Sequence, residues 1–185
     1  MQLTTALTTL VLSLVASTGA LTIGERTADG AFEVLHTRDV LDGTLTWYGD
    51  SGVEPAKRAP EEPEAAASLA ERQNTGCGSY RIECGDKYSY YGPTCQKLIV
   101  AVTSDSWLFQ SPRAVCFGQD GADQCCISWS KVPLLSTHQR DLVASANRVL
   151  AQCGLYSVKS GLERNVLLGG TCMTQCLSNR PTGCQ

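Results

Sequence analysis

Apolar residues in the second half of the chain recur at the spacing of an α-helix in two places. In residues 94–102 they stand at i, i+3, i+4 and i+7, and Thr94 is placed to cap the start of the helix. Ahead of the second stripe, in residues 136–153, Ser136 and Gln139 match a capping box. The pattern predicts two helices, and each has one apolar face that needs a partner surface.

Shorter runs with apolar residues at alternate positions predict β-strands. In the second half of the chain these runs cover residues 79–84, 112–118, 124–130 and 164–168. The dipeptide Asp120-Gly121 lies between the second and third runs and favours a hairpin. Two earlier runs, residues 32–35 and 44–49, flank another Asp-Gly dipeptide. They favour a second hairpin, which would be marginal in water without a partner surface.

The order strand, helix, strand, strand, helix, strand over residues 77–185 predicts an α+β fold. We expect a two-layer sandwich with two helices on one side of an antiparallel-rich sheet, in the β-α-β-β-α-β order of a split βαβ unit. Residues 172–185 carry three cysteines among turn-forming residues, and we expect a loop-rich tail there.

The cysteines are confined to one part of the chain. Residues 1–76 contain none, and residues 77–185 contain all ten. This density is typical of a disulfide-stapled scaffold from an oxidising compartment, and the even number predicts five bridges whose pairing the sequence leaves open. We expect disulfide bonds at Cys77, Cys84, Cys95, Cys116, Cys125, Cys126, Cys153, Cys172, Cys176 and Cys184.

Four of these cysteines constrain the fold further. Cys125 and Cys126 are neighbours on one predicted strand, so their side chains point to opposite faces of the sheet. We expect one of them to bridge to the helix layer and the other to the open face or the C-terminal tail. Cys95 and Cys153 lie on the apolar faces of the two predicted helices, so we expect each helix to be bonded to the sheet.

The first residues have the pattern of a secretory signal peptide. Within residues 1–20 a short apolar core is followed by small residues, and Ala20 stands at a suitable cleavage point. No Lys or Arg precedes the apolar core. A signal peptide and a disulfide scaffold both indicate a secreted, extracellular protein.

A dibasic pair, Lys57-Arg58, follows further along the chain. A processing protease would cut at such a pair, and we interpret residues 21–58 as a candidate pro-segment. The alternative is an ordinary solvated pair in a segment that the protein keeps. Residues 59–76 are rich in Glu, Pro and Ala, which predicts a disordered linker before the cysteine-rich domain of residues 77–185.

Charge excludes some classes of partner. The formal net charge is −3, and it divides into −6 for residues 21–76 and +3 for residues 77–185. A surplus of three positive charges in residues 77–185, without a run of basic residues, does not favour binding to nucleic acid. No apolar run reaches the length of about 18 residues that a transmembrane helix needs. We expect a monomer without a transmembrane segment.

The domain offers few groups for catalysis or metal binding. His138 is its single histidine, and Asp141 lies three residues further on in the same exposed turn. Its two glutamates, Glu83 and Glu163, show no spacing that would bring them together as in a glycoside hydrolase. A zinc site would need a second cluster of ligands. We expect no catalytic residue, no metal and no cofactor.

An aromatic cluster is the one candidate for binding. It consists of Tyr88, Tyr90 and Tyr91, with Trp107 further along the chain. Exposed aromatic rings stack on sugars or fill pockets of a partner protein. The alternative is that these rings pack inside the domain, as we expect for Trp129 on its predicted strand.

Three motifs stand out by their cysteines and aromatic residues. They are Cys125–Ser130 (CCISWS), Gly170–Arg180 (GTCMTQCLSNR) followed by Gly183-Cys184, and the upstream Gly43–Gly49 (GTLTWYG). Together they resemble small secreted fungal proteins with a "WD-like" domain, which is unrelated to the WD40 propeller. The resemblance covers about residues 77–185 and implies no catalytic role, because the family has no established activity.

A more distant likeness concerns the layout of helices and cysteines. It is similar to secreted necrosis-inducing effectors and to killer-toxin-like α/β sandwiches, which is an analogy at the level of the fold. The sequence as a whole favours a secreted effector-like or toxin-like binding factor that is not an enzyme. Its expected partner is an unknown extracellular protein or glycan. Two alternatives stay open, a structural or cell-wall-associated extracellular protein and a small hydrolase.

Overall fold

The fold is seen in a computed structural model of the chain. The structure describes residues 32–40, 42–50, 77–103, 107–108, 112–118, 124–134, 137–154 and 159–184. The predicted signal peptide with Ala20, the Lys57-Arg58 pair and the predicted linker lie outside the described residues.

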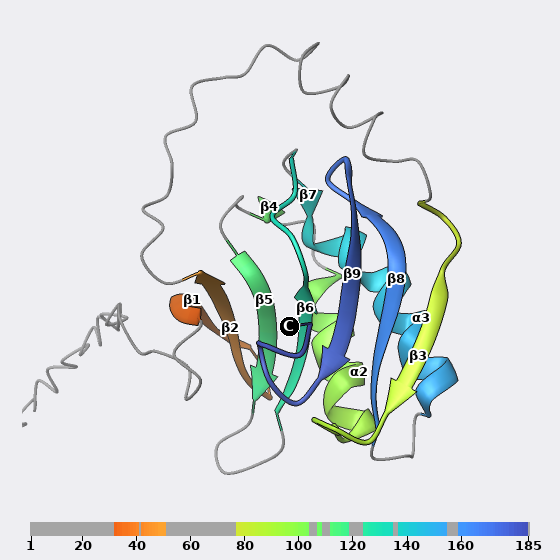
Figure 1. Cartoon of the computed structure of the whole chain (residues 1–185). Coiled ribbons are helices and arrows are strands. Elements are labelled where there is room, and N and C mark those ends of the chain that lie inside the picture. Colours follow the sequence, from red (N-terminus) through yellow and green to blue (C-terminus); the bar gives the residue numbers. More distant parts are fainter. Residues whose placement is uncertain are drawn as a thin grey trace, which may run out of the picture.

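Seven strands form one antiparallel sheet in the order β1-β2-β5-β6-β9-β8-β3 (Figure 1). In chain order the strands are β1 (Phe32–Val40), β2 (Gly43–Asp50), β3 (Arg81–Gly85), β5 (Pro112–Gly118), β6 (Cys125–Trp129), β8 (Ser160–Leu168) and β9 (Thr171–Ser178). A separate pair is formed by β4 (Trp107–Leu108) and β7 (Thr137–His138). The sheet therefore joins segments from nearly the whole described chain.

Two α-helices cover one face of this sheet. Helix α2 (Gly92–Val102) packs on β5 and β6, and α3 (Val143–Cys153), which follows the short 3-10 helix η1 (Gln139–Leu142), packs on β3, β8 and β9. Both helices lie behind the sheet in Figure 1. The apolar stripes predicted for them are buried, as shown by Leu98 and Val102 in α2 and by Val149 and Leu150 in α3.

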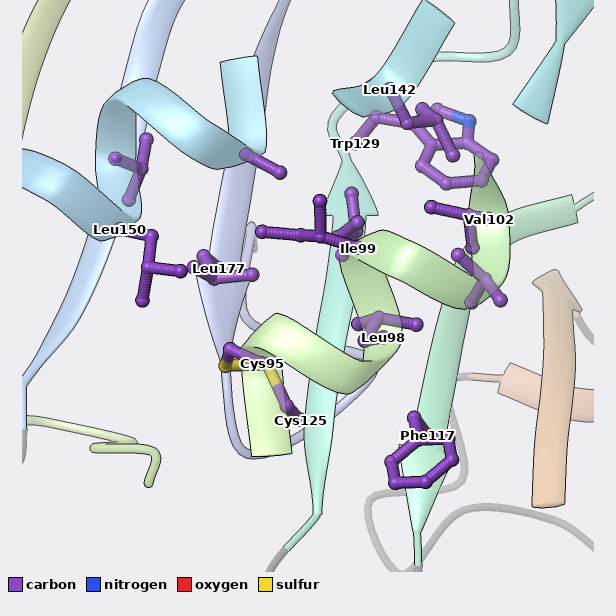
Figure 2. Close-up of a cluster of buried hydrophobic side chains, with 14 of the residues drawn as sticks. Cys95, Leu98, Ile99, Val102, Phe117, Cys125, Trp129, Leu142, Leu150 and Leu177 are labelled. Carbon is purple, nitrogen blue, oxygen red and sulfur yellow. A yellow bond between two sulfur atoms is a disulfide. The ribbon is translucent and has the colours of Figure 1, made fainter. Parts of the chain in front are cut away.

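The hydrophobic core lies between the helices and the sheet. Figure 2 shows side chains of α2 meeting those of the central strands in this layer. Those labelled there are Cys95, Leu98, Ile99, Val102, Phe117, Cys125, Trp129, Leu142, Leu150 and Leu177. The residues of β5 and β6 that belong to this core stand at alternate positions, as the pleat requires.

The α+β class predicted from the sequence is wrong, because the fold is predominantly β. Within the described residues, a seven-stranded antiparallel sheet is accompanied by only two α-helices of 11 residues each. The predicted strand and helix order omitted two parts of this sheet. One is the hairpin of β1 and β2, which is hydrogen-bonded to β5, and the other is β9.

Strand β9 lies where the sequence predicted a loop-rich tail. Gly169 and Gly170 have φ values of 51° and 72° and form the tight turn that joins β8 to β9. The strand was missed because polar and apolar residues are mixed along it, so no strong alternation marks it. Met173 and Leu177 nevertheless point into the core. Because β9 lies between β6 and β8, it connects the two halves of the sheet.

Both helices begin differently from the prediction. Helix α2 begins at Gly92 rather than after Thr94, with Tyr91 as its N-cap and no side-chain cap. Helix α3 begins at Val143, after η1. Asp141 caps η1, because its carboxylate accepts hydrogen bonds from the backbone N–H of His138 (2.9 Å) and the hydroxyl of Thr137 (2.6 Å). Ser136, the predicted cap, lies outside the described residues.

All ten cysteines form disulfides, which confirms the prediction of five bridges. The pairs are Cys77–Cys172, Cys84–Cys153, Cys95–Cys125, Cys116–Cys126 and Cys176–Cys184. Each α-helix is bonded to a strand, as predicted. Cys125 and Cys126 diverge as predicted, since the first reaches α2 and the second joins β6 to its neighbour β5.

The C-terminal segment, residues 179–184, covers part of the other face of the sheet. Cys184 is bonded to Cys176 on β9, and its sulfur lies 3.4 Å from the carbonyl oxygen of Ser128 on β6. Thr182 of this segment is buried, and so is Ser128 of β6. In Figure 1 the C-terminus lies in front of the sheet, opposite the helices. Both faces are therefore covered over the central strands.

Candidate functional site

The edge of the sheet formed by β3 carries an unusual backbone corner. Tyr80, just before β3, has a φ of +42°, and Asn165, at an irregularity in β8, has a φ of +60°. Residues other than glycine rarely adopt this left-handed region, and such strain persists only where the surroundings enforce it. Asn165 supplies that enforcement, because its carbonyl accepts the N–H of Gly78 (3.0 Å) and its side-chain amide donates to the Ser79 hydroxyl.

A buried carboxylate lies behind this corner. Glu163 on β8 is fully buried and accepts two hydrogen bonds from the guanidinium of Arg148 on α3, at 2.7 and 3.0 Å. The bidentate geometry fixes the plane of the guanidinium. The hydrogen bond to Glu163 also raises the pKa of Arg148 above its ordinary value, so the guanidinium stays charged. Glu163 thus acts as a rigid support for Arg148.

The Tyr80 ring completes the arrangement at the surface. It lies 4.6 Å from the Arg148 guanidinium carbon, which is a cation–π contact. The Tyr80 residue is 49 % exposed and the Arg148 side chain is 41 % exposed. We call these two residues the Tyr80–Arg148 platform. It is an open aromatic ring and a guanidinium edge, held in place by Glu163 and by the Cys77–Cys172 disulfide just ahead in the chain.

The second glutamate of the domain faces the other way. In the β3–β8 pairing, Ile82 stands opposite Glu163 and Glu83 stands opposite Leu162, so the two carboxylates project from opposite faces of the sheet. Glu83 pairs with Arg164 at 3.0 and 3.1 Å, and the hydrogen bond from Arg164 lowers the pKa of Glu83. The two carboxylates therefore cannot flank one glycosidic bond.

The structure separates the aromatic cluster predicted from the sequence. Tyr90 is 1 % exposed and belongs to the core, where burial raises its pKa to about 12. It is therefore excluded as a surface binding group. Tyr91 is exposed at the start of α2, and the Tyr88 ring is stacked against Arg180 at 3.1 Å. Trp107 is placed on β4, outside the large sheet, and its side chain is not among those described.

The remaining chemical candidates have structural partners. Asp141 caps η1 through the Thr137 hydroxyl and the His138 backbone, as described above. His138 lies on β7 opposite Trp107. In the part of the chain that the structure describes, no group of three or more His, Cys, Asp or Glu residues is placed to hold a metal ion. No helix in the same part is both long and apolar enough to cross a membrane.

Sequence reasoning missed the Tyr80–Arg148 platform. The alternation in residues 79–84 places Tyr80 in a strand, and a single arginine on a polar helix face carries no signal of its own. The row of residues that contains Glu163 is visible only in the fold. Gly161, Glu163 and, after the irregularity, Val166 and Leu168 all point into the layer covered by α3. A glutamate in such a row needs a partner of opposite charge on the covering helix.

Comparison with known proteins gives one match. A family model described as "Fungal WD-like" matches residues 64–184. Neither the curated proteins nor the solved structures contain a match to the chain. The likeness to killer toxins and necrosis-inducing effectors has no support in these comparisons.

Proposed function

Because the chain belongs to the fungal WD-like family, we propose that it is a secreted, effector-like or toxin-like binding factor that acts outside the cell without catalysing a reaction. The five disulfides support an extracellular location, since such bonds persist in oxidising compartments. The opposite orientation of Glu83 and Glu163 supports the absence of glycoside hydrolysis by this pair.

The observation that carries the proposal is the Tyr80–Arg148 platform. A binding surface gains affinity when its contact groups are already held in the bound geometry. Arg148 is held by Glu163, and the backbone at Tyr80 is fixed by its neighbours at the β8 irregularity. The backbone of Tyr80 is strained, and its ring gains little from burial because it is exposed. Such strain is typical of a functional position.

We propose a glycan as the partner. The flat ring of Tyr80 suits the apolar face of a sugar, and the guanidinium edge offers N–H donors to hydroxyl groups. Glu163 neutralises the charge of Arg148, so the platform has little attraction for phosphate or an acidic peptide. A neutral sugar chain therefore fits it better than an anionic partner does.

The test is binding of the purified protein to insoluble chitin, β-glucan and cellulose. We expect retention on at least one of them, and we expect Tyr80→Ala to weaken it about tenfold, the order of one aromatic stacking contact. Tyr80→Phe keeps the ring and is expected to restore binding. Tyr91→Ala is the matched control, because Tyr91 is exposed to a similar extent but lies at the start of α2.

Two results would contradict the proposal. One is no retention on any of the three polysaccharides, and the other is equal loss with Tyr80→Ala and Tyr91→Ala. The effector-like or toxin-like part is tested separately by applying the purified protein to growing cells and to tissue. Growth inhibition or necrosis that Tyr80→Ala abolishes is the expected result.

A further inference from the structure

The hairpin of β1 and β2 has no covalent bond to the sheet other than the backbone. All five disulfides lie within residues 77–184, and residues 32–50 contain no cysteine. The match to the family model also begins at residue 64, after the hairpin. Yet the hairpin forms one whole edge of the sheet, beside β5 (Figure 1).

Its contacts with the domain are those of a core element. Strand β2 pairs with β5 from Thr44 opposite Gly118 to Gly49 opposite Pro112. Leu45 and Trp47 of β2 are buried in the same hydrophobic cluster as Phe117 of β5. Burying each of these large side chains stabilises the assembly by about 1.5–3 kcal/mol. The hairpin thus binds through both its backbone and its side chains.

A largely buried arginine links the hairpin to two strands of the domain. Arg113 on β5 donates to the carboxylate of Asp50 at 2.9 Å and to the carbonyl of Trp129 on β6 at 3.1 Å. Its guanidinium carbon also lies 5.7 Å from the ring of Phe32 in β1. Phe32 and Asp50 stand opposite each other at the open end of the hairpin, so Arg113 holds that end from one position on the domain.

The surface that receives the hairpin is rigid. Strand β5 is bonded to β6 by Cys116–Cys126, and its inward side chains Val115 and Phe117 pack in the core. An edge strand of this kind accepts an added strand through its free N–H and C=O groups, and pockets for alternate side chains give specificity. Here the alternate side chains are those of Leu45 and Trp47.

We propose that the β5 edge is a strand-acceptor site whose occupant is residues 32–50 of this chain, bound tightly enough to stay in place when the backbone between residues 51 and 76 is cut. The cut protein is then a two-chain protein with the same seven-stranded sheet. This proposal differs from the hypothesis that residues 21–58 are a pro-segment that is discarded. If the chain is cut at Lys57-Arg58, the hairpin stays bound to the domain. The inference is independent of the proposed glycan binding.

The test starts from the full folded chain with a recognition sequence for a site-specific protease placed at residues 55–60. After cleavage, native mass spectrometry and gel filtration are expected to show both fragments in one species, which separates only in concentrated guanidinium chloride. Release of the hairpin fragment under native conditions overturns the proposal, whether the domain then keeps its near-ultraviolet circular dichroism or aggregates.

A matched pair of variants locates the binding energy. Arg113→Met removes the link to Asp50, whereas Lys97→Met removes only the exposed contact of Lys97 with Asp42, which spans 3.7 Å. In a dilution series of the cut protein we expect Arg113→Met to raise the dissociation constant of the hairpin about tenfold or more and Lys97→Met less than about threefold. Equal effects of the two substitutions would contradict the assigned role of Arg113.

Discussion

At the scale of single residues, the core contains a buried polar group that lowers the stability of the fold. The hydroxyl of Tyr90 is buried without a hydrogen-bond partner among the described residues, although the ring fills space beside α2. A buried polar group without a partner lowers stability, because it loses its hydrogen bonds to water on folding. The same burial raises the pKa of Tyr90 from 10.0 to about 12.

Tyr90→Phe is therefore expected to be as stable as the wild type at neutral pH, or more stable. The raised pKa means that the folded state disfavours ionised Tyr90. The contribution of neutral Tyr90 to the free energy of unfolding is therefore intact below about pH 10 and is lost as the pH rises toward about 12. At about pH 11 the wild type should lose about 1.4 kcal/mol relative to Tyr90→Phe.

The measurement is the free energy of unfolding in urea at about pH 9 and about pH 11. Tyr91→Phe serves as the control, because it removes a hydroxyl from an exposed ring. If the wild type and Tyr90→Phe lose the same free energy between the two pH values, the ionisation of Tyr90 is not coupled to folding.

At the scale of elements, helix α3 packs very closely on strand β8. A Cβ atom on Gly161 would lie 2.5 Å from both the Cys153 sulfur and a methyl group of Val149. The absence of a side chain at Gly161 thus lets α3 approach β8 and reach β3 through Cys84–Cys153. At Gly118, at the end of β5, a Cβ atom would meet nothing within 4 Å.

Gly161→Ala is expected to destabilise the protein by about 1–3 kcal/mol, because the helix must shift to make room. Gly118→Ala should change stability by less than about 0.5 kcal/mol, since it adds a methyl group in open space. Urea unfolding of the two variants under non-reducing conditions makes the comparison. A Gly161→Ala protein as stable as Gly118→Ala would show that α3 does not depend on this approach.

The helices were predictable because their apolar stripes are long and end in clear signals. The stripe before Gly154 is an example, and Gly154, the C-cap of α3, has a φ of +102° that favours glycine. The divergence of Cys125 and Cys126 followed from the alternation of a strand alone. These features depend on local periodicity, which a single sequence displays.

The strand order and the candidate site were not predictable in the same way. Strand β9 and the hairpin of β1 and β2 are stabilised by neighbours that lie far away in the sequence. The Tyr80–Arg148 platform needs the pairing of β3 with β8 and the packing of α3 on both. Neither the pairing nor the packing leaves a mark within a short window of residues, and the fold class was wrong for this reason.

The whole molecule depends on its cross-links. Each disulfide contributes on the order of 2–4 kcal/mol, and five together match or exceed the stability of about 5–15 kcal/mol that a domain has in total. They connect both α-helices, the first residues of the domain and the C-terminal segment to the sheet. The loss of all five should leave no stable native state.

Reduction is therefore expected to unfold the protein. Near-ultraviolet circular dichroism and resistance to protease, measured before and after treatment with a thiol reductant, give the readout. A sample treated only with an alkylating reagent is the control, because a protein without free cysteines should not react with it. A reduced protein that kept both properties would show that the core alone stabilises the fold.

The position of β9 has a consequence for biosynthesis. Of the seven described strands of the sheet it is the last to be translated, yet it lies between β6 and β8. As the chain leaves the ribosome from its N-terminus, β8 and β3 have no hydrogen-bonded connection to the other four strands until Thr171–Ser178 emerges. The sheet is therefore completed only after Thr171–Ser178 has left the ribosome. A nonsense mutation before Thr171 would therefore yield a chain whose sheet is divided into two parts that are not hydrogen-bonded to each other. We expect cellular quality control to degrade such a chain.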